Sequence, residues 1–332
     1  MQTACRDGSP GALRRRPLLA GAAGLLLGGA SHAALAAEEG PYPNRPVRFV
    51  VGGGPDQLAR IVADKLAAKW GQGVFVEQRA GASGLLATEF IASQPPDGYN
   101  LLLTTISFSS QLVLQRKVPG KGNLLPVAMI ATLPFVLVVN NDLPFKSVQD
   151  LVAYAKAHPG KLNFGSAGIG APGQLNGEML KQMAGIDMVV VNYKSVAAAL
   201  TDVVAGQIQL IFSPVPAALQ LVKAGKLRAI AVSSPKRYGP LPEVPTVMEQ
   251  GYPDFQLVTW NGIHVGPGTP DALRDRIAAD MAEVMNTPDG REKALAAGFE
   301  LSTMNRTEFE AFMQADVARI AKVIKDGNIK PE

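Results

Sequence analysis

Short apolar strands alternate with helical patterns along most of this 332-residue chain. Residues 47–51 form an uninterrupted apolar run, which is typical of a strand buried on both faces of a parallel sheet. The next segment places Leu58 and Val62 at helical spacing and ends at Gly71. Further strands and helices follow in turn as far as residue 232. This alternation predicts an α/β architecture built on parallel sheets.

One uncharged run, from Leu124 to Val139, could be taken for a membrane segment. It is shorter than the roughly 20 residues that a spanning helix needs, and Pro126 and Pro134 interrupt it. We therefore predict two consecutive buried strands, PVAMIA and FVLVV. Because no flexible linker separates two domains in this chain, these strands are expected to carry the backbone from one domain to the other.

The C-terminal part reads as helical. Helices are expected over residues 270–285 and 291–297 and from Thr307 onward. Thr307 and Glu310 have the spacing of a capping box, which predicts that the last helix begins there. Its apolar stripe, which includes Phe309, is expected to pack in the core.

The N-terminus has the three parts of a secretory leader. Arg14–Arg16 precede an apolar stretch over residues 18–30, and the small residues Ala34 and Ala36 follow. We predict that residues 1–36 are removed by cleavage near Ala36. The arginines leave both the general and the twin-arginine export routes open.

Removing this leader changes the net charge and the cysteine and histidine content from which a function can be inferred. It carries four Arg and one Asp, so its loss lowers the net charge from +4 to about +1. The mature chain then has no basic excess that would indicate a nucleic-acid partner. The single cysteine, Cys5, leaves with the leader, and His158 and His264 stand alone. We expect no metal site, no cofactor and no histidine-based catalysis.

A literal G-x-G-x-x-G motif is formed by Gly168, Gly170 and Gly173. A dinucleotide-binding fold places this motif at its first strand–helix turn, with an acidic residue about 20 residues later at the end of the second strand. Here the motif lies in the middle of the chain, and Asp187 precedes the following strand. Neither a P-loop nor a G-x-S-x-G serine elbow is present. The motif is better interpreted as a loop that holds an anion at a helix N-terminus.

Two further glycine loops, over residues 52–56 and 81–84, also join a strand to a helix. Each loop alone could simply be a tight turn. Several such loops in one exported α/β protein favour an anion held between facing helix N-termini.

Many stretches of the chain, taken in order, resemble one known family. These are YPNRPVRFVV, GGGPDQLAR, VEQRAGASG, PPDGYNLLL, LNFGSAGIG, VNYKS, ALTDVVAGQIQLIF, AGKLRAIAV, LPEVPTV and KDGNIKPE. From Tyr42 to Glu332 the chain is similar to the periplasmic substrate-binding proteins of tripartite tricarboxylate transporters, the Bug family. The resemblance implies a type II-like Venus-flytrap fold, with two parallel-sheet α/β lobes joined by two hinge crossings. Lobe 1 would comprise residues 42–131 and 258–332, and lobe 2 residues 132–257.

The same resemblance implies which residues face a ligand in the cleft. They are Gly53, Gly54, Asp56, Thr104, Thr105, Ser107, Ser166, Ala167, Gly168, Gly170, Tyr193 and Ser213, with Lys194 beside Tyr193. The chain departs from the family pattern in four places. The loop over residues 52–56 is shorter, and residues 171–174 stand where hydroxyl residues and a His are usual. Residues 192–195 read NYKS where PYKG is usual, and Ser213 stands where an Asp is common. The resemblance still implies a carboxylate ligand. The side chains that determine which carboxylate binds in the family are not kept in this chain.

The implied function is capture of a small carboxylate in the periplasm and its delivery to membrane permease subunits. A monomer is expected. No enzymatic activity is expected, because no nucleophile–base–orienter set is apparent in the sequence. Two alternatives stay open at this point: a ligand sensor for a signalling receptor, and a degenerate member that no longer binds. The shorter first loop is expected to suit a bulkier acid.

Overall fold

The structure, a computed structural model, describes residues 41–331 apart from 53–55, 80, 82–83, 115–122, 256 and 303. The predicted leader, residues 1–36, and the predicted ligand residues Gly53 and Gly54 therefore lie outside the described residues.

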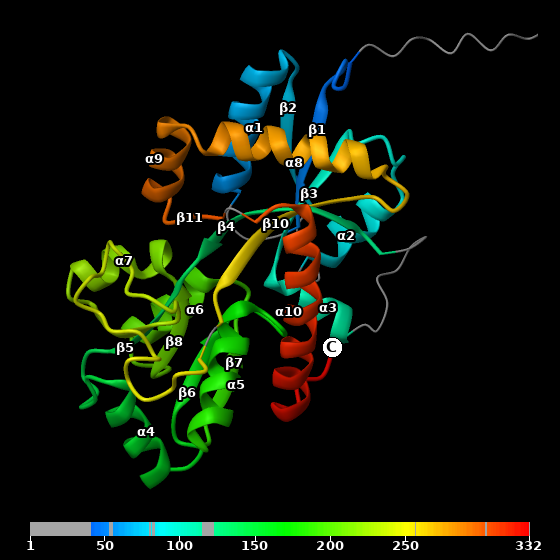
Figure 1. Ribbon diagram of the computed structural model, residues 1–332. Coiled ribbons are helices and arrows are strands. Elements are labelled where there is room, and N and C mark those ends of the chain that lie inside the picture. Colours follow the sequence, from blue (N-terminus) through cyan, green and yellow to red (C-terminus); the bar gives the residue numbers. More distant parts are fainter. Residues whose placement is uncertain are drawn as a thin grey trace, which may run out of the picture. The chain divides into compact units, whose positions relative to one another are not determined.

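In the described part of the chain, the strands form a six-stranded sheet and a five-stranded sheet (Figure 1). The six-stranded sheet has the order β11-β4-β10-β3-β1-β2. Its strands are β1 (Val47–Val51), β2 (Val74–Gln78), β3 (Asn100–Thr105), β4 (Leu125–Leu133), β10 (Thr259–Val265) and β11 (Glu300–Leu301). The five-stranded sheet has the order β7-β6-β8-β5-β9. Its strands are β5 (Phe135–Asn140), β6 (Asn163–Ser166), β7 (Val189–Asn192), β8 (Leu210–Pro214) and β9 (Leu227–Val232).

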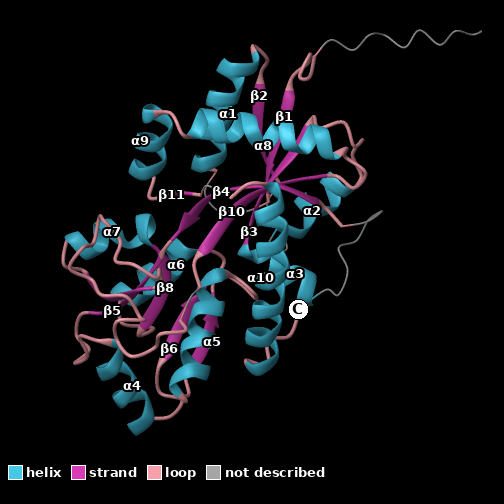
Figure 2. Ribbon diagram, viewed as in Figure 1, coloured by secondary structure: helices cyan, strands magenta, loops and turns pink. Residues whose placement is uncertain are grey.

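Helices accompany each sheet, so that each sheet forms an α/β lobe (Figure 2). Lobe 1, on the six-stranded sheet, contains α1 (Gln57–Trp70), α2 (Leu85–Ala92), α3 (Ile106–Leu114), α8 (Asp271–Met285), α9 (Pro288–Ala296) and α10 (Arg306–Asp326). Lobe 2, on the five-stranded sheet, contains α4 (Val148–Ala157), α5 (Pro172–Ala184), α6 (Val196–Val204) and α7 (Val215–Lys223). The predicted two-lobed α/β architecture is confirmed.

Both sheets are mixed, because each combines the predicted parallel pairs of strands with antiparallel pairs. β1 runs parallel to β2 and β3, whereas β10 runs antiparallel to β3 and β4. In lobe 2, β5 runs antiparallel to β8 and β9. Parallel neighbours need a crossover connection within one lobe. A strand that enters from the other lobe has no such crossover, so its direction is not constrained in this way.

The chain passes between the sheets at two places. Pro134 alone separates β4 from β5, and these two strands are the predicted PVAMIA and FVLVV segments. The Pro134 carbonyl accepts a hydrogen bond from the Val215 backbone N–H at 3.2 Å, which ties this crossing to the start of α7. The second passage, residues 233–258, leads from β9 to β10.

Several helix starts differ from the predictions. The last helix begins at Arg306, and its capping box is formed by Asn305 and Glu308 rather than by Thr307 and Glu310. Asn is among the best N-cap residues, so the earlier start satisfies more backbone donors. α9 begins at Pro288 because Thr287 caps it and proline is favoured in the first turn. α3 was not predicted, since its three serines have low helix propensity.

α10 contacts both lobes. Its residue Phe309 belongs to a buried apolar cluster that also contains Trp260 of β10 and Leu175 of α5. The Gln182 side chain of α5 donates a hydrogen bond through Nε2 to the Val323 carbonyl of α10 at 2.9 Å. The C-terminal helix is thus a third point of contact between the lobes, besides the two backbone crossings.

None of the helices in the described part of the chain combines the length and the apolar character that a membrane span requires.

Candidate functional site

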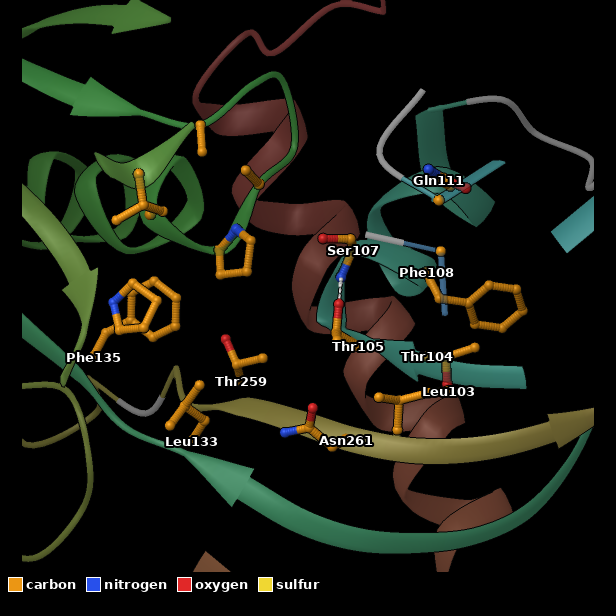
Figure 3. Close-up of a pocket in the computed structure, with 18 of the residues that line it drawn as sticks. Leu103, Thr104, Thr105, Ser107, Phe108, Gln111, Leu133, Phe135, Thr259 and Asn261 are labelled. Atoms are coloured by element: carbon orange, nitrogen blue, oxygen red, sulfur yellow. Dashed lines mark hydrogen bonds between the residues drawn. The ribbon is translucent and has the colours of Figure 1, made fainter. Parts of the chain in front are cut away.

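A cavity of about 420 Å³ opens between residues of the two lobes, a size typical of small-ligand sites. Lobe 1 contributes Gly52, Gly81, Gly84, Thr88, Leu102, Leu103, Thr104, Thr105, Ser107, Phe108, Gln111, Leu133, Thr259, Asn261 and Phe299. Lobe 2 contributes Phe135, Ala167, Ala171, Pro172, Gly173, Lys194, Val196, Ile211, Phe212 and Pro214. Figure 3 shows Phe135 and Leu133 on one side of Thr259, and Thr105 and Ser107 on the other.

Five helices begin at residues that line this cavity. Gly84 is the N-cap of α2, Thr105 directly precedes α3, Pro172 and Val196 open α5 and α6, and Pro214 is the N-cap of α7. The first N–H groups of a helix lack partners within it, and the helix dipole places partial positive charge there. Helix starts from both lobes therefore give the cavity a positive potential that is carried by the backbone.

Glycines allow these backbone segments to approach closely. A Cβ on Gly52 would lie 2.9 Å from the Cα of Gly84, so the two glycine loops of lobe 1 meet without room for side chains. In lobe 2, a Cβ on Gly173 would lie 2.8 Å from the Phe212 carbonyl oxygen of β8. The glycine at the start of α5 thus lets this helix approach the sheet closely beside the cavity.

The G-x-G-x-x-G loop forms part of the cavity wall. Gly168 and Gly170 have φ values of 120° and 69°, a region that favours glycine. The Ser166 hydroxyl donates to the Gly168 carbonyl at 2.8 Å, and the Gly170 N–H donates to Gln174 Oε1 at 2.7 Å. The loop is held by its own hydrogen bonds, and Ala167 and residues 171–173 line the cavity.

Thr104 lines the cavity, but its hydroxyl has partners within the protein. Its Oγ1 lies 2.8 Å from His264 Nδ1 and 3.0 Å from the Gly262 carbonyl oxygen. Both bonds form when His264 donates from Nδ1 and Thr104 donates to Gly262. Burial lowers the pKa of His264 to about 3, so this imidazole is neutral at pH 7.

The structure brings only some of the predicted side chains to the cavity. Thr104, Thr105, Ser107, Ala167 and Lys194 line it.

Other predicted residues do not line it, namely Asp56, Ser166, Gly168, Gly170, Tyr193 and Ser213. Asp56 forms an ion pair with Arg60, which lowers the pKa of its carboxyl group. The Tyr193 hydroxyl donates to Asp202 at 2.8 Å, and the Ser213 hydroxyl donates to the Pro214 carbonyl at 3.1 Å.

The sequence-based prediction missed the apolar walls and two polar residues of β10. Phe108, Phe135 and Phe299 line the cavity, as do Thr259 and Asn261. Polar Thr259 and Asn261 alternate with apolar Trp260, which is typical of a strand with one polar and one apolar face. This pattern could have identified Thr259 and Asn261 as candidate cavity residues.

Charge is sparse around the cavity. Among the described residues that line it, Lys194 is the one charged side chain, and it is exposed. In the described ranges, no three His, Cys, Asp or Glu side chains gather as metal ligands would. The cavity therefore suits an anion bound largely by backbone dipoles, with an apolar body against the aromatic walls.

Comparison with known proteins agrees with this arrangement. The sequence model of the tripartite tricarboxylate transporter family receptor matches residues 58–329. Protein BugT of Bordetella pertussis is 31% identical over 297 residues, which cover 87% of this chain and 91% of BugT. Two solved structures are similar. R. palustris Rpa4515 with adipate has a TM-score of 0.79 and 31% identity, over 88% of this chain and all of that one. MatC from Rhodopseudomonas palustris with bound malate has a TM-score of 0.75 and 26% identity, over 85% and 100%.

Proposed function

Since the chain belongs to the tripartite tricarboxylate transporter receptor family, we propose that it captures a small carboxylate between its lobes for uptake. Members of this family are periplasmic binding proteins, and the predicted leader is consistent with that location. Two similar structures hold the carboxylates adipate and malate. The family match favours transport over a sensing role or a loss of binding.

The observation that carries this proposal is the set of five helix starts at one cavity. Each helix N-terminus favours an anion by about 0.3–1 kcal/mol, and by up to about 2 kcal/mol where it is partly buried. Starts from both lobes meet at the cavity, so an anion placed there would favour the closed arrangement of the lobes. Delivery to permease subunits would then depend on this closed form.

We assign the carboxylate to the starts of α3 and α5. Thr105 and Ser107 would bind it from lobe 1, and the backbone N–H of Gly173 from lobe 2, with Lys194 adding charge at the rim. The glycine loops predicted from sequence, including Gly53 and Gly54, keep a proposed role in shaping the anion site. The Ser166 side chain supports the glycine loop of lobe 2, because its hydroxyl donates to the Gly168 carbonyl.

Thermal unfolding of the mature chain with mono-, di- and tricarboxylates tests this function. Each acid is paired with its primary amide, which has nearly the same shape but no charge. A ligand at a hundredfold excess over its Kd stabilises the folded protein by about 2.7 kcal/mol. We expect stabilisation by at least one acid and none by the matching amide. Equal responses to both, or no response to any acid, would contradict the proposal.

The transport role has its own test in cells. Deleting the gene should abolish uptake of the acid identified above, and restoring it should restore uptake. Unchanged uptake with an altered transcriptional response to that acid would show a sensor instead. We also propose a monomer that closes on its ligand, so small-angle scattering should show a smaller radius of gyration once that acid is added.

A further inference from the structure

Two buried side chains at the cavity have polar atoms without partners. They are Thr259, through Oγ1, and Asn261, through Nδ2, and each residue is only 5% exposed. Arg79, Asn176 and Arg274 also have such atoms, and none of these residues lines the cavity. Burying a polar group without a hydrogen bond destabilises a protein, so such groups call for an explanation.

The position of both residues follows from the strand. Side chains two residues apart lie on the same face, and the residue between them lies on the other. Trp260 lies between Thr259 and Asn261 in the sequence, and its side chain is on the opposite face of the strand. There its indole Nε1 donates a hydrogen bond to Asp316 at 2.8 Å. Fixing Trp260 in this way turns Thr259 and Asn261 toward the cavity (Figure 3).

A β-bulge occurs at the same point. Asn261 pairs with Ala131 and Gly262 with Met129, so Ile130 of β4 has no partner on β10. On the other edge of β4, the Ile130 carbonyl accepts a hydrogen bond from the Ser302 N–H at 3.0 Å, next to β11. Bulges bend a strand and change the direction of its side chains, and they are frequent beside functional sites.

The surroundings of the pair are uncharged and largely apolar. Leu133 and Phe135 lie near Thr259 on the cavity wall, and Lys194 is the one charged lining residue in the described part of the chain. A second carboxylate at β10 would be desolvated without a buried cation to compensate it. A hydroxyl or carbonyl group needs only hydrogen bonds, which Thr259 and Asn261 can supply.

We propose that Thr259 and Asn261 recognise a neutral polar group at the far end of the ligand. The ligand class would then be a monocarboxylate whose acid group is separated from a hydroxyl or carbonyl group by an apolar body. This inference rests on the proposed function, because the helix starts must hold the acid group for β10 to contact the other end.

Calorimetric titration with three matched series tests the assignment. The series are straight-chain acids from butanoate to octanoate, the ω-hydroxy acids of the same lengths, and the corresponding dicarboxylates. At the best length, we expect the hydroxy acid to bind about tenfold more tightly than the plain acid, the effect of one well-made buried hydrogen bond. Thr259→Val and Asn261→Leu should each reduce the ratio of hydroxy-acid affinity to plain-acid affinity.

Stability of the ligand-free protein supplies a second readout. Both substitutions remove an unpaired buried polar atom, so neither should lower the midpoint of urea unfolding, and Thr259→Val should raise it. The control is Thr246→Val in the second passage, residues 233–258. Thr246 is 1% exposed, and its Oγ1 accepts from the Glu249 N–H at 2.9 Å. This variant should lower the midpoint and leave the ligand preference intact.

The outcomes separate the two proposals. If no acid binds, both fail. If acids bind but plain and hydroxy acids bind equally, or if the dicarboxylate binds most tightly, the neutral-end assignment fails and carboxylate capture stands. A lower urea midpoint for both β10 variants would show that these atoms have structural partners, and it would also overturn the assignment.

Discussion

The carboxylate of Asp316 in α10 accepts a hydrogen bond from the Trp260 indole of β10 at 2.8 Å. The same oxygen accepts from the Ser109 hydroxyl of α3 at 2.6 Å. Asp316 therefore joins three elements behind the cavity. Since α3 carries Ser107 and β10 carries Asn261, this carboxylate holds two walls of the site without touching them.

Replacing Asp316 tests this role as a positioning residue. Asp316→Ala would leave the buried indole and hydroxyl donors unpaired and would remove the ion pair between Asp316 and Arg319. We expect the free energy of unfolding to fall by roughly 3 kcal/mol, measured by urea denaturation. The control is Asp326→Ala, which breaks an exposed ion pair with Lys322 on the same helix and should cost less than about 1 kcal/mol. Similar losses for both variants would contradict the assigned role.

His264 makes stability depend on pH. Its folded-state pKa of about 3 lies below the ordinary value of 6.5, because burial among Phe108, Trp260 and Phe309 disfavours the charged ring. Its contribution is fully present above pH 6.5 and is lost as the pH falls toward 3, since only the unfolded chain binds the proton. At pH 5 the loss should be about 2 kcal/mol.

Urea denaturation between pH 7 and pH 4.5 measures this loss. His264→Gln keeps a donor for Thr104 but does not titrate, so its stability should change much less over that interval. A variant with the same pH slope as the native chain would show that other groups are responsible. Below that interval, the carboxylates Asp56, Asp150, Glu249 and Asp275, whose pKa values are lowered, contribute a further loss.

Gly173 is expected to matter for both packing and binding. In Gly173→Ala, the new Cβ would meet the Phe212 carbonyl at 2.8 Å and push α5 away from β8. We expect a loss of about 1–3 kcal/mol in unfolding free energy and weaker carboxylate binding. Gly239→Ala is the matched control, because a Cβ there meets nothing within 4 Å. That variant should be neutral or more stable by about 0.4–1 kcal/mol.

Lys194 should contribute modestly to affinity and strongly to its salt dependence. The side chain is exposed at the cavity rim, so Lys194→Gln should weaken binding of a carboxylate by only a few fold. The remaining affinity should vary less with salt, because helix dipoles inside the cavity are screened less than an exposed ammonium group. Titrations at low and high salt measure both effects. Complete loss of binding would mean that the side chain, and not the backbone, anchors the acid.

The fold was largely predictable because its signals are local. Apolar runs predicted the strands, and the uncharged run at Leu124–Val139 predicted the crossing at Pro134. The direction of β5 and β10 was not predictable, because it depends on how the lobes meet. The spacing of Thr307 and Glu310 predicts that α10 begins at Thr307, whereas Asn305 supplies the cap and the helix begins at Arg306.

The site was less predictable than the fold, because its parts are far apart in sequence. Resemblance indicated the loops around Thr105 and Ala167, and both line the cavity. It could not show that the Tyr193 hydroxyl is engaged by Asp202, since that depends on the packing of α6. Nor could it show Thr259 and Asn261 at the cavity, because their direction depends on Trp260 and a carboxylate 56 residues away in sequence.

The convergence of helix starts at the cavity has a consequence for how such receptors diversify. Peptide dipoles are common to every sequence that adopts the fold, so no single codon change removes them. The proposed binding site for the acid group is therefore a property of the fold rather than of particular side chains. Residues such as Phe135, Thr259 and Asn261 can then be substituted one at a time. Such substitutions would change which ligand binds while the proposed acid-binding site is kept.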